Sequence, residues 1–265
     1  MTTIPADYPA RLDAWKALRL RNLKAANGWL NIIGRYWLEP GSVTVGSAGD
    51  NDIVLSAGPA HVGTITEDET GVTFAPADGG EPLRLTLDKQ RPPQFEVGPL
   101  LLEVTTMNGE NALRVRDKES KAPEALAAID YFPVRPEWRI VAEWVPFEQE
   151  LTVNTSHNIP TDVVATHKAV FSHEGQTYEL IATHGTPSAP QFVIRDLTSR
   201  DSTYGACRFV YGEDVTEGSI VLDFNKAINP PCAFTEHAVC PLPPPQNVLP
   251  FRIEAGEKRV EVAGA

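Results

Sequence analysis

The sequence lacks any apolar run that approaches the length of a membrane-spanning helix, for which about 20 predominantly apolar residues are needed. Its first residues, MTTIPADYPARLDAW, also lack the apolar core of a signal peptide. We therefore expect a cytoplasmic protein that does not bind a membrane. Cysteine is scarce as well, and in a reducing compartment we expect free thiols at Cys207, Cys232 and Cys240.

Basic residues are in deficit: 23 Lys and Arg stand against 35 Asp and Glu, which gives a formal net charge of −12. Nucleic acid binding needs clustered Lys and Arg to neutralise phosphates, and the basic residues here are scattered. The sequence also has no glycine-rich phosphate loop and no G-x-S-x-G nucleophile motif. These absences argue against a nucleic acid partner, and we expect no cofactor.

The sequence does contain one helical segment, followed by short strands. Residues 7–27 carry an apolar stripe and end at Asn27-Gly28, a stop signal because both residues tolerate a left-handed conformation. Beyond Gly28, short apolar runs alternate with turn residues, a spacing typical of a sandwich or barrel rather than of a βαβ fold. Two hairpin turns are predicted, at MNGEN and at EGQ, residues 174–176.

We predict a mainly β protein in three parts. An N-terminal helix occupies residues 1–28, an FHA-like β-sandwich (the resemblance is given below) residues 29–130, and a second antiparallel β-barrel or β-roll residues 131–265. The segment 121–134, KAPEALAAIDYFPV, is predicted to be a short helical connection. Proline-rich stretches in the last part are expected to flank strands and to close the sheet edge, since proline cannot donate to another strand. The stretch LPFRIEAG is predicted to be the final strand.

Three blocks of the sequence, RDLTSRDSTYGACRF, LDFNKAINPPCAF and CPLPPPQNVLPFRIEAGEK, resemble a family of bacterial and archaeal proteins of unknown function. The likeness runs from about Trp15 to Lys258, and GWLNIIGRYWLEPG and VRDKES…YFPV look like its N-terminal and middle motifs. The chain departs from the family at Arg200, where the family has glycine, and at His237, where it has an aromatic residue. The resemblance implies boundaries for the fold and no particular activity.

The stretch VTVGSAGDNDIVLSAGPAHVGTITED is similar to the core of a forkhead-associated (FHA) domain, a β-sandwich that reads phosphothreonine. The resemblance implies phosphate contacts from an arginine directly after the strand glycine and from a serine before the histidine, His61. Ser47 and the run Gly58-Pro59-Ala60 occupy those places, so the charge-assisted donors that a phosphate needs are absent. We expect the sandwich without phosphothreonine reading, and a protein-interaction module with a protein partner is one alternative function.

The cysteines allow two further hypotheses. Cys232, His237 and Cys240 supply ligand types found in zinc sites, but CxxC spacing is missing and no metal is predicted. A thiol nucleophile needs a base and a cationic setting. Cys207 and Arg208 lie next to each other on a predicted strand, where neighbouring side chains point to opposite faces. The simpler interpretation is that the thiols are small buried residues.

The sequence favours a polar ligand pocket in the C-terminal part. Asp223 and Asn225 lie two apart on GSIVLDFN, a spacing that places both on one face of a strand. With the preceding hairpin, the predicted ligand-binding residues are Asp196, Thr203, Tyr204, Arg208, Asp223, Asn225, Asn229 and Cys232. Such a face suits a small polar molecule, or alternatively a hydrolase or transferase reaction. A structural network remains open, because Asn and Asp satisfy backbone groups that proline-rich loops leave unpaired.

Overall fold

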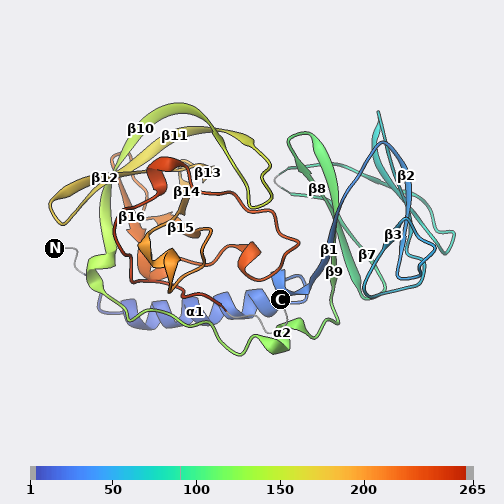
Figure 1. Cartoon of the computed structure of the whole chain (residues 1–265), viewed down its shortest axis with the longest axis horizontal. Helices are drawn as coiled ribbons and strands as arrows, with labels where there is room; N and C mark the ends of the chain where they lie inside the picture. The colour runs from blue at the N-terminus through green and yellow to red at the C-terminus, as the bar shows by residue number, and fades with distance from the viewer. Residues whose placement is uncertain (1–3, 90, 261–265) are drawn as a thin grey trace. The chain divides into compact units, whose positions relative to one another are not determined.

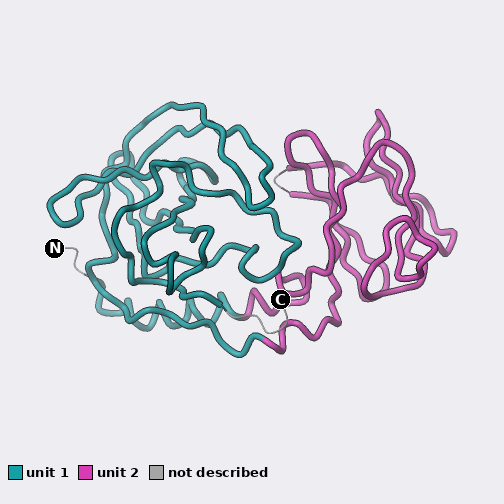
Figure 2. Tube along the Cα trace, in the orientation of Figure 1, with its two compact units in different colours: residues 1–20, 126–265 teal, residues 21–125 magenta. Residues whose placement is uncertain are grey.

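The computed structural model describes residues 4–89 and 91–260 and confirms a mainly β protein with an N-terminal helix (Figure 1). The chain forms two compact units, one of residues 1–20 and 126–265 and the other of residues 21–125 (Figure 2). Helix α1 (Tyr8–Lys24) begins in the first unit and ends in the second. No helix among the described residues is long and apolar enough to cross a membrane.

The unit of residues 21–125 is a sandwich of two sheets. One sheet has the order β1 (Ile32–Trp37), β9 (Glu110–Asp117), β8 (Leu100–Met107), β7 (Gln94–Val97). The other has the order β3 (Ile53–Val54), β2 (Gly41–Gly46), β4 (Gly63–Asp68), β5 (Gly71–Pro76), β6 (Leu83–Leu85). Both sheets contribute to one core, in which Ile65 and Phe74 pack with Leu102 and Leu113. This unit also contains the 3₁₀ turn η1 (Trp29–Asn31) and the short helix α2 (Ala122–Ala125).

The unit formed by residues 1–20 and 126–265 is built on one seven-stranded sheet. Its order is β12 (Gln176–Ile181), β11 (Thr161–His173), β10 (Arg139–Val153), β16 (Ser219–Asp223), β15 (Arg208–Glu213), β14 (Ala189–Ile194), β13 (His184–Thr186). All neighbouring strands are antiparallel. Over the described residues β12 and β13 stay at the two edges, so the sheet does not close into a barrel. Its core includes Trp138, Phe171, Phe192, Leu222 and Phe224.

Both predicted hairpin turns form, and for the expected reason. Asn108 and Gly109, between β8 and β9, have φ angles of 52° and 86°. Glu174 and Gly175, between β11 and β12, have φ angles of 50° and 78°. Two consecutive residues with positive φ define the turn whose twist matches that of the flanking strands.

The proline-rich end of the chain has little regular structure. Among the described residues it contains 3₁₀ turns and isolated bridges but no strand after β16, so the prediction of a final strand at residues 249–256 was wrong. The 3₁₀ turns of this unit are η2 (Pro136–Trp138), η3 (Leu197–Arg200), η4 (Phe224–Lys226), η5 (Pro231–Ala233) and η6 (Pro245–Asn247). The helical connection predicted over 121–134 is likewise limited to the four residues of α2. Proline removes ladder donors, which explains why the chain here cannot pair continuously.

The core of the seven-stranded unit gives a stability prediction. Phe224 is fully buried, and its ring lies 6.0 Å from the Trp138 ring and 6.2 Å from the Phe171 ring. Replacing it by alanine should lower the free energy of unfolding by about 3–5 kcal/mol, because the substitution removes buried apolar surface and also leaves a cavity. Val164→Thr, at a side chain that is 56% exposed, is the control and should change it by less than about 0.5 kcal/mol. Urea unfolding measures both, and equal midpoints for Phe224→Ala and wild type would contradict this packing.

Candidate functional site

The eight residues predicted to bind a ligand all lie in the unit of residues 1–20 and 126–265. Six of them are buried, whereas Tyr204 and Cys232 are half-buried. The structure distributes them over separate hydrogen-bond networks whose partners are other parts of the same unit. None of the eight lines any of the three cavities described for the protein.

The first network surrounds Arg208, which is 1% exposed at the start of β15. Its guanidinium donates to the Asp196 carboxylate at 2.6 Å and to the backbone carbonyls of Ile253 and Ala255 at 3.0 and 2.5 Å. Asp196 also accepts from the backbone and hydroxyl of Thr198, at 2.9 and 2.6 Å, and thereby caps η3. Thr203 joins through a 2.9 Å contact between its hydroxyl and that of Thr198. This network binds the C-terminal chain to the sheet.

The second network contains Asp223 and Asn225, which do not share the face of one strand. Strand β16 ends at Asp223, whose carboxylate accepts from the Asn225 backbone N–H at 3.2 Å and starts η4. The Asp223 side chain thus gives the Asn225 N–H a partner in place of a neighbouring strand, and the strand ends. The prediction that both side chains lie on one face of a strand was therefore wrong. Tyr8 Oη donates to Asp223 Oδ2 at 2.8 Å, and Asn225 forms two hydrogen bonds of 3.0 Å with the backbone of Arg135.

The third network joins Asn229 to α1 and to the chain end. The Asn229 backbone N–H donates to Glu257 Oε2 at 2.6 Å, and its side chain donates to the Lys258 carbonyl at 2.8 Å. Glu257 in turn accepts from Arg19 of α1 at 3.0 Å. The Tyr204 hydroxyl donates to the Cys232 carbonyl at 3.1 Å. These contacts fit the structural-network alternative, in which polar side chains satisfy the backbone of proline-rich loops.

Metal-ligating geometry is not found among the described residues: no group of three or more His, Cys, Asp or Glu is arranged to hold an ion. Cys232, His237 and Cys240 therefore do not form such a group. His167 of β11 and His184 of β13 both line a small cavity of about 130 Å³ beside Trp144. The His167 ring stacks on the Trp144 ring at 4.9 Å.

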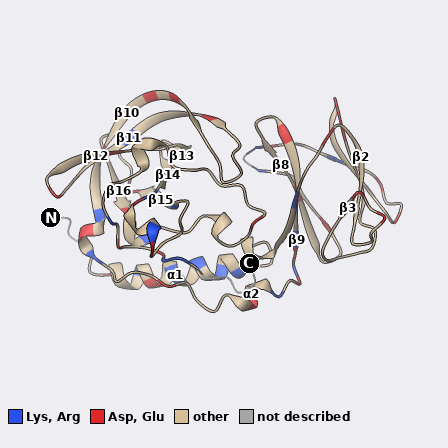
Figure 3. Ribbon diagram, viewed as in Figure 1, with Lys and Arg blue, Asp and Glu red and all other residues tan. Residues whose placement is uncertain are grey.

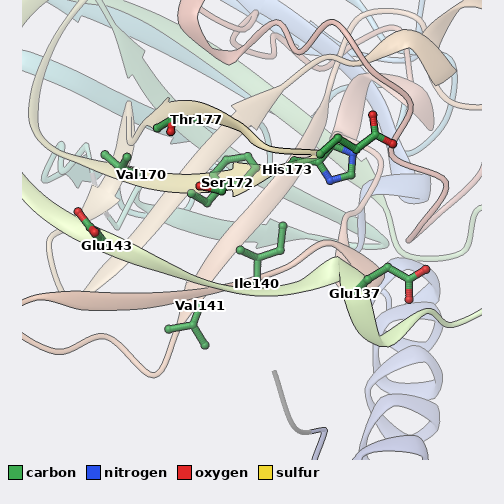
Figure 4. Close-up of a pocket in the computed structure, with 10 residues that line it drawn as sticks. Glu137, Ile140, Val141, Glu143, Val170, Ser172, His173 and Thr177 are labelled. Carbon is green, nitrogen blue, oxygen red and sulfur yellow. The ribbon is translucent and has the colours of Figure 1, made fainter. Parts of the chain in front are cut away.

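The largest described cavity lies where β10 and β11 separate. Their ladder runs from Val153 and Thr161 to the pair Glu143 and Val170 and goes no further among the described residues. From there β10 continues along β16, whereas β11 continues along β12. The gap holds a cavity of about 730 Å³ (Figure 4), which we call the β10–β11 cleft. Its ten lining residues are Glu137, Ile140, Val141, Glu143, Val170, Phe171, Ser172, His173, Glu174 and Thr177.

The cleft is lined from both faces of the sheet, as expected where two strands part. Phe171 belongs to the core, Ile140 packs against it, and Figure 4 shows Ile140 pointing between the two strands. Glu143 and Val141 come from the other face of β10. At one end the His173 ring stacks on the Trp138 ring at 5.0 Å. The cleft thus combines an apolar floor with a polar rim.

The rim carries negative charge. Glu137, Glu143 and Glu174 are exposed, and among the described residues none gives these carboxylates a hydrogen bond or an ion pair. None of the ten lining residues is Lys or Arg. Strand β10 as a whole holds three glutamates and one arginine, Arg139, and that arginine pairs with Asp214 at 2.9 Å. Figure 3 shows acidic residues in red along this strand. A cation entering the cleft therefore meets free carboxylates and no competing internal cation.

The sequence does not reveal this cleft. The residues that line it, His173 among them, look like ordinary strand positions. The lengths of the two strands give no signal either, because β10 has 15 residues and β11 has 13. The cleft depends on which neighbour each strand takes, and the sequence does not show that choice.

Comparison with known proteins places the chain in a family. The model of the family described as "Protein of unknown function (DUF1684)" matches residues 124–258, a little over half of the chain. The chain belongs to this family. The chain is also similar to an uncharacterised protein of Haloarcula marismortui whose structure was solved by solution NMR. The sequences are 26% identical, the match covers 51% of this chain and 78% of that protein's chain, and the TM-score is 0.42. No curated protein matches the sequence.

The Asp223 network makes stability depend on pH in a defined direction. Burial raises the pKa of Asp223 above its ordinary value of 3.8, against the opposing effects of Tyr8 and Lys226. The unfolded chain therefore releases this proton at lower pH than the folded chain. The wild type should lose stability relative to Asp223→Asn as the pH rises through and above 3.8, until the folded carboxyl is also ionised.

Urea titrations of both proteins across the acid range measure this difference. Asp13→Asn, at an exposed position of α1, controls for the loss of one carboxyl charge. A difference between wild type and Asp223→Asn that stays constant with pH, or that grows in favour of the wild type, would contradict the assignment.

Proposed function

We propose that this protein is a binding protein whose β10–β11 cleft takes a small organic cation, an ammonium group carried on an apolar body. The ligand is thus a small polar molecule bound in the C-terminal half of the chain. The observation that carries the proposal is a cavity of about 730 Å³ whose lining contains three glutamates and no Lys or Arg. This volume lies in the range of about 300–1,000 Å³ that is typical of small-molecule sites.

Charge supports a cation over an anion. Three free carboxylates project from the rim, and each gives an attraction of about 1 kcal/mol at 4 Å in a water-like dielectric. An anion would be repelled by the same carboxylates with a similar energy, and the lining has no Lys or Arg to offset this repulsion. Because the glutamates are exposed, the attraction is screened by salt beyond about 8 Å at physiological ionic strength.

The apolar lining supports an organic cation over an inorganic ion. Ile140, Phe171 and Val170 give a ligand apolar surface to bury, at about 25 cal/mol per Å². A simple hydrated cation would gain nothing from this floor. The described carboxylates also do not form a group that could hold a metal ion. An ammonium on an aliphatic or aromatic body uses both parts of the cleft.

The parted strands add hydrogen-bonding capacity. Residues 139–142 of β10 pair with β16 on one side, and residues 171–173 of β11 pair with β12 on one side. Their other edges face the cleft, where no ladder joins them among the described residues. Free strand edges carry backbone donors and acceptors that can fix the orientation of a polar ligand.

Three compounds that share a phenethyl group and differ in the charge of their end group test the proposal. Phenethylamine, phenethyl alcohol and 3-phenylpropionate are titrated into the labelled full chain, and amide shifts are followed by NMR. The amine should bind with a dissociation constant in the range of about 0.01–1 mM and shift residues of 137–143 and 170–177. The alcohol should bind more weakly and the acid least.

A pair of matched variants separates the rim charges from general acidity. Glu137→Gln combined with Glu143→Gln should weaken amine binding about tenfold, since two exposed charges are worth about 1.4 kcal/mol together. Glu148→Gln combined with Glu217→Gln, both exposed and outside the lining, should leave the constant unchanged. Equal binding of amine and acid, shifts elsewhere, or equal effects of the two double variants would overturn the proposal.

A further inference from the structure

Two cysteines that are separated in sequence by seven residues meet in the fold. Cys232 lies in η5, and its backbone N–H donates to Cys240 Sγ at 3.1 Å. The backbone nitrogen and the Sγ of one cysteine are joined through Cα and Cβ alone, so the Cys240 sulfur lies within reach of the Cys232 side chain. Both thiols are free. Cys240 is 1% exposed, whereas Cys232 is half-buried.

Different segments hold the two cysteines in place. The Tyr204 hydroxyl donates to the Cys232 carbonyl at 3.1 Å. Ser156 lies in the connection between β10 and β11, and its hydroxyl accepts from the Cys240 N–H at 3.1 Å. The Ser156 backbone N–H donates to the Cys240 carbonyl at 2.8 Å. These anchors fix both backbones, so sulfur–sulfur approach requires side-chain rotation and not a rearrangement of the loop.

We propose that Cys232 and Cys240 are a redox-active thiol pair that a small-molecule disulfide, such as oxidised glutathione, converts into an intramolecular disulfide. Cys232 is the attacking thiol because it is the less buried of the two. Cys240 is the resolving thiol because it is buried directly beside Cys232. This modification site is independent of the β10–β11 cleft.

The reaction proceeds in two exchange steps. The Cys232 thiolate attacks one sulfur of the small disulfide, a bond forms between these two sulfurs, and one small thiolate leaves. Cys240 then attacks the Cys232 sulfur, its proton passes to the second leaving thiolate, and the protein disulfide forms. In total two protein thiols are oxidised, and one small disulfide is reduced to two small thiols.

Acid–base properties agree with these roles. The pKa of the Cys232 thiol is lowered from its ordinary value, first by a hydrogen bond with the Cys240 side chain and further by Tyr204. The same hydrogen bond raises the pKa of Cys240, and burial raises it further. A thiol that ionises more readily and is exposed reacts first with an electrophile.

Cys207 provides an internal control. It is 1% exposed, packs with Val193 and Phe209, and lies 3.6 Å from the Pro241 carbonyl. Burial raises the pKa of its thiol. We therefore expect it to stay reduced under conditions that oxidise the pair.

The first test uses the unmodified full chain. Reduced protein is equilibrated in a series of glutathione redox buffers, quenched with acid and analysed by intact mass and peptide mapping. The native chain should lose two hydrogens, with the linkage between the peptides of Cys232 and Cys240. If it keeps three free thiols in buffers that oxidise the denatured chain, or if the linkage involves Cys207, the proposal fails.

Single variants separate the two roles. Cys240→Ser should stop at a mixed disulfide with glutathione on Cys232, Cys232→Ser should form neither product, and Cys207→Ser should behave like the wild type. Circular dichroism and urea midpoints establish that each variant is folded. No adduct on Cys240→Ser, or an intact reaction in Cys232→Ser, would overturn the assignment of roles.

Limited alkylation of the wild type covers the case in which a variant does not fold. Iodoacetamide should label Cys232 about tenfold faster than Cys207 or Cys240, because Cys232 alone of the three is only half-buried and has a lowered pKa. Equal labelling of the three, or labelling of Cys207 first, would contradict the proposal.

Discussion

The buried ion pair between Arg208 and Asp196 is the constraint on which the C-terminal part of the fold depends. Placing a guanidinium at 1% exposure costs several kcal/mol of hydration, which the pair alone repays only with excellent geometry and further hydrogen bonds. Those further bonds come from the carbonyls of Ile253 and Ala255. The segment after β16 has no ladder of its own in the described part of the chain, so two of its carbonyls find their partners in the N–H groups of this cation.

Buried polar side chains also bond backbone groups at other places where the proline-rich chain crosses the sheet. Asn247 uses its side chain to bond the backbone of Ile181 and Val193, at 2.8 and 2.9 Å. Asn229 and Glu257 do so on the α1 side. A side-chain amide carries a donor and an acceptor, as a peptide group does, and can replace a missing strand at one point. Buried polar residues in this unit are therefore explained first by the prolines beside them.

Local signals made part of the fold predictable from sequence. The turns at Asn108-Gly109 and Glu174-Gly175 depend on the conformational freedom of a few residues, and sequence alone shows it. The N-terminal helix was predictable as well, but it ends at Lys24 and Gly28 has a φ of −72°, so the left-handed stop predicted at Asn27-Gly28 was wrong. The positions of Asp223 and Asn225 were harder to predict. The Asp223 carboxylate accepts from the Asn225 backbone N–H and ends the strand, so the two side chains do not follow the alternation of a strand. The cleft was beyond reach, since it exists only because β10 and β11 take different partners, a non-local choice.

Charge in this protein has opposite consequences in the interior and at the cleft. Inside, Arg208 has a direct partner, and its removal would leave an uncompensated buried carboxylate. At the cleft, Glu137, Glu143 and Glu174 remain hydrated, so they cost the fold little and attract a ligand only weakly. For the proposed ligand, exposed charge would select the sign, while the affinity would depend on how much of the ligand's apolar surface covers Ile140 and Phe171. Selectivity for cations and modest affinity would then follow from the same exposure.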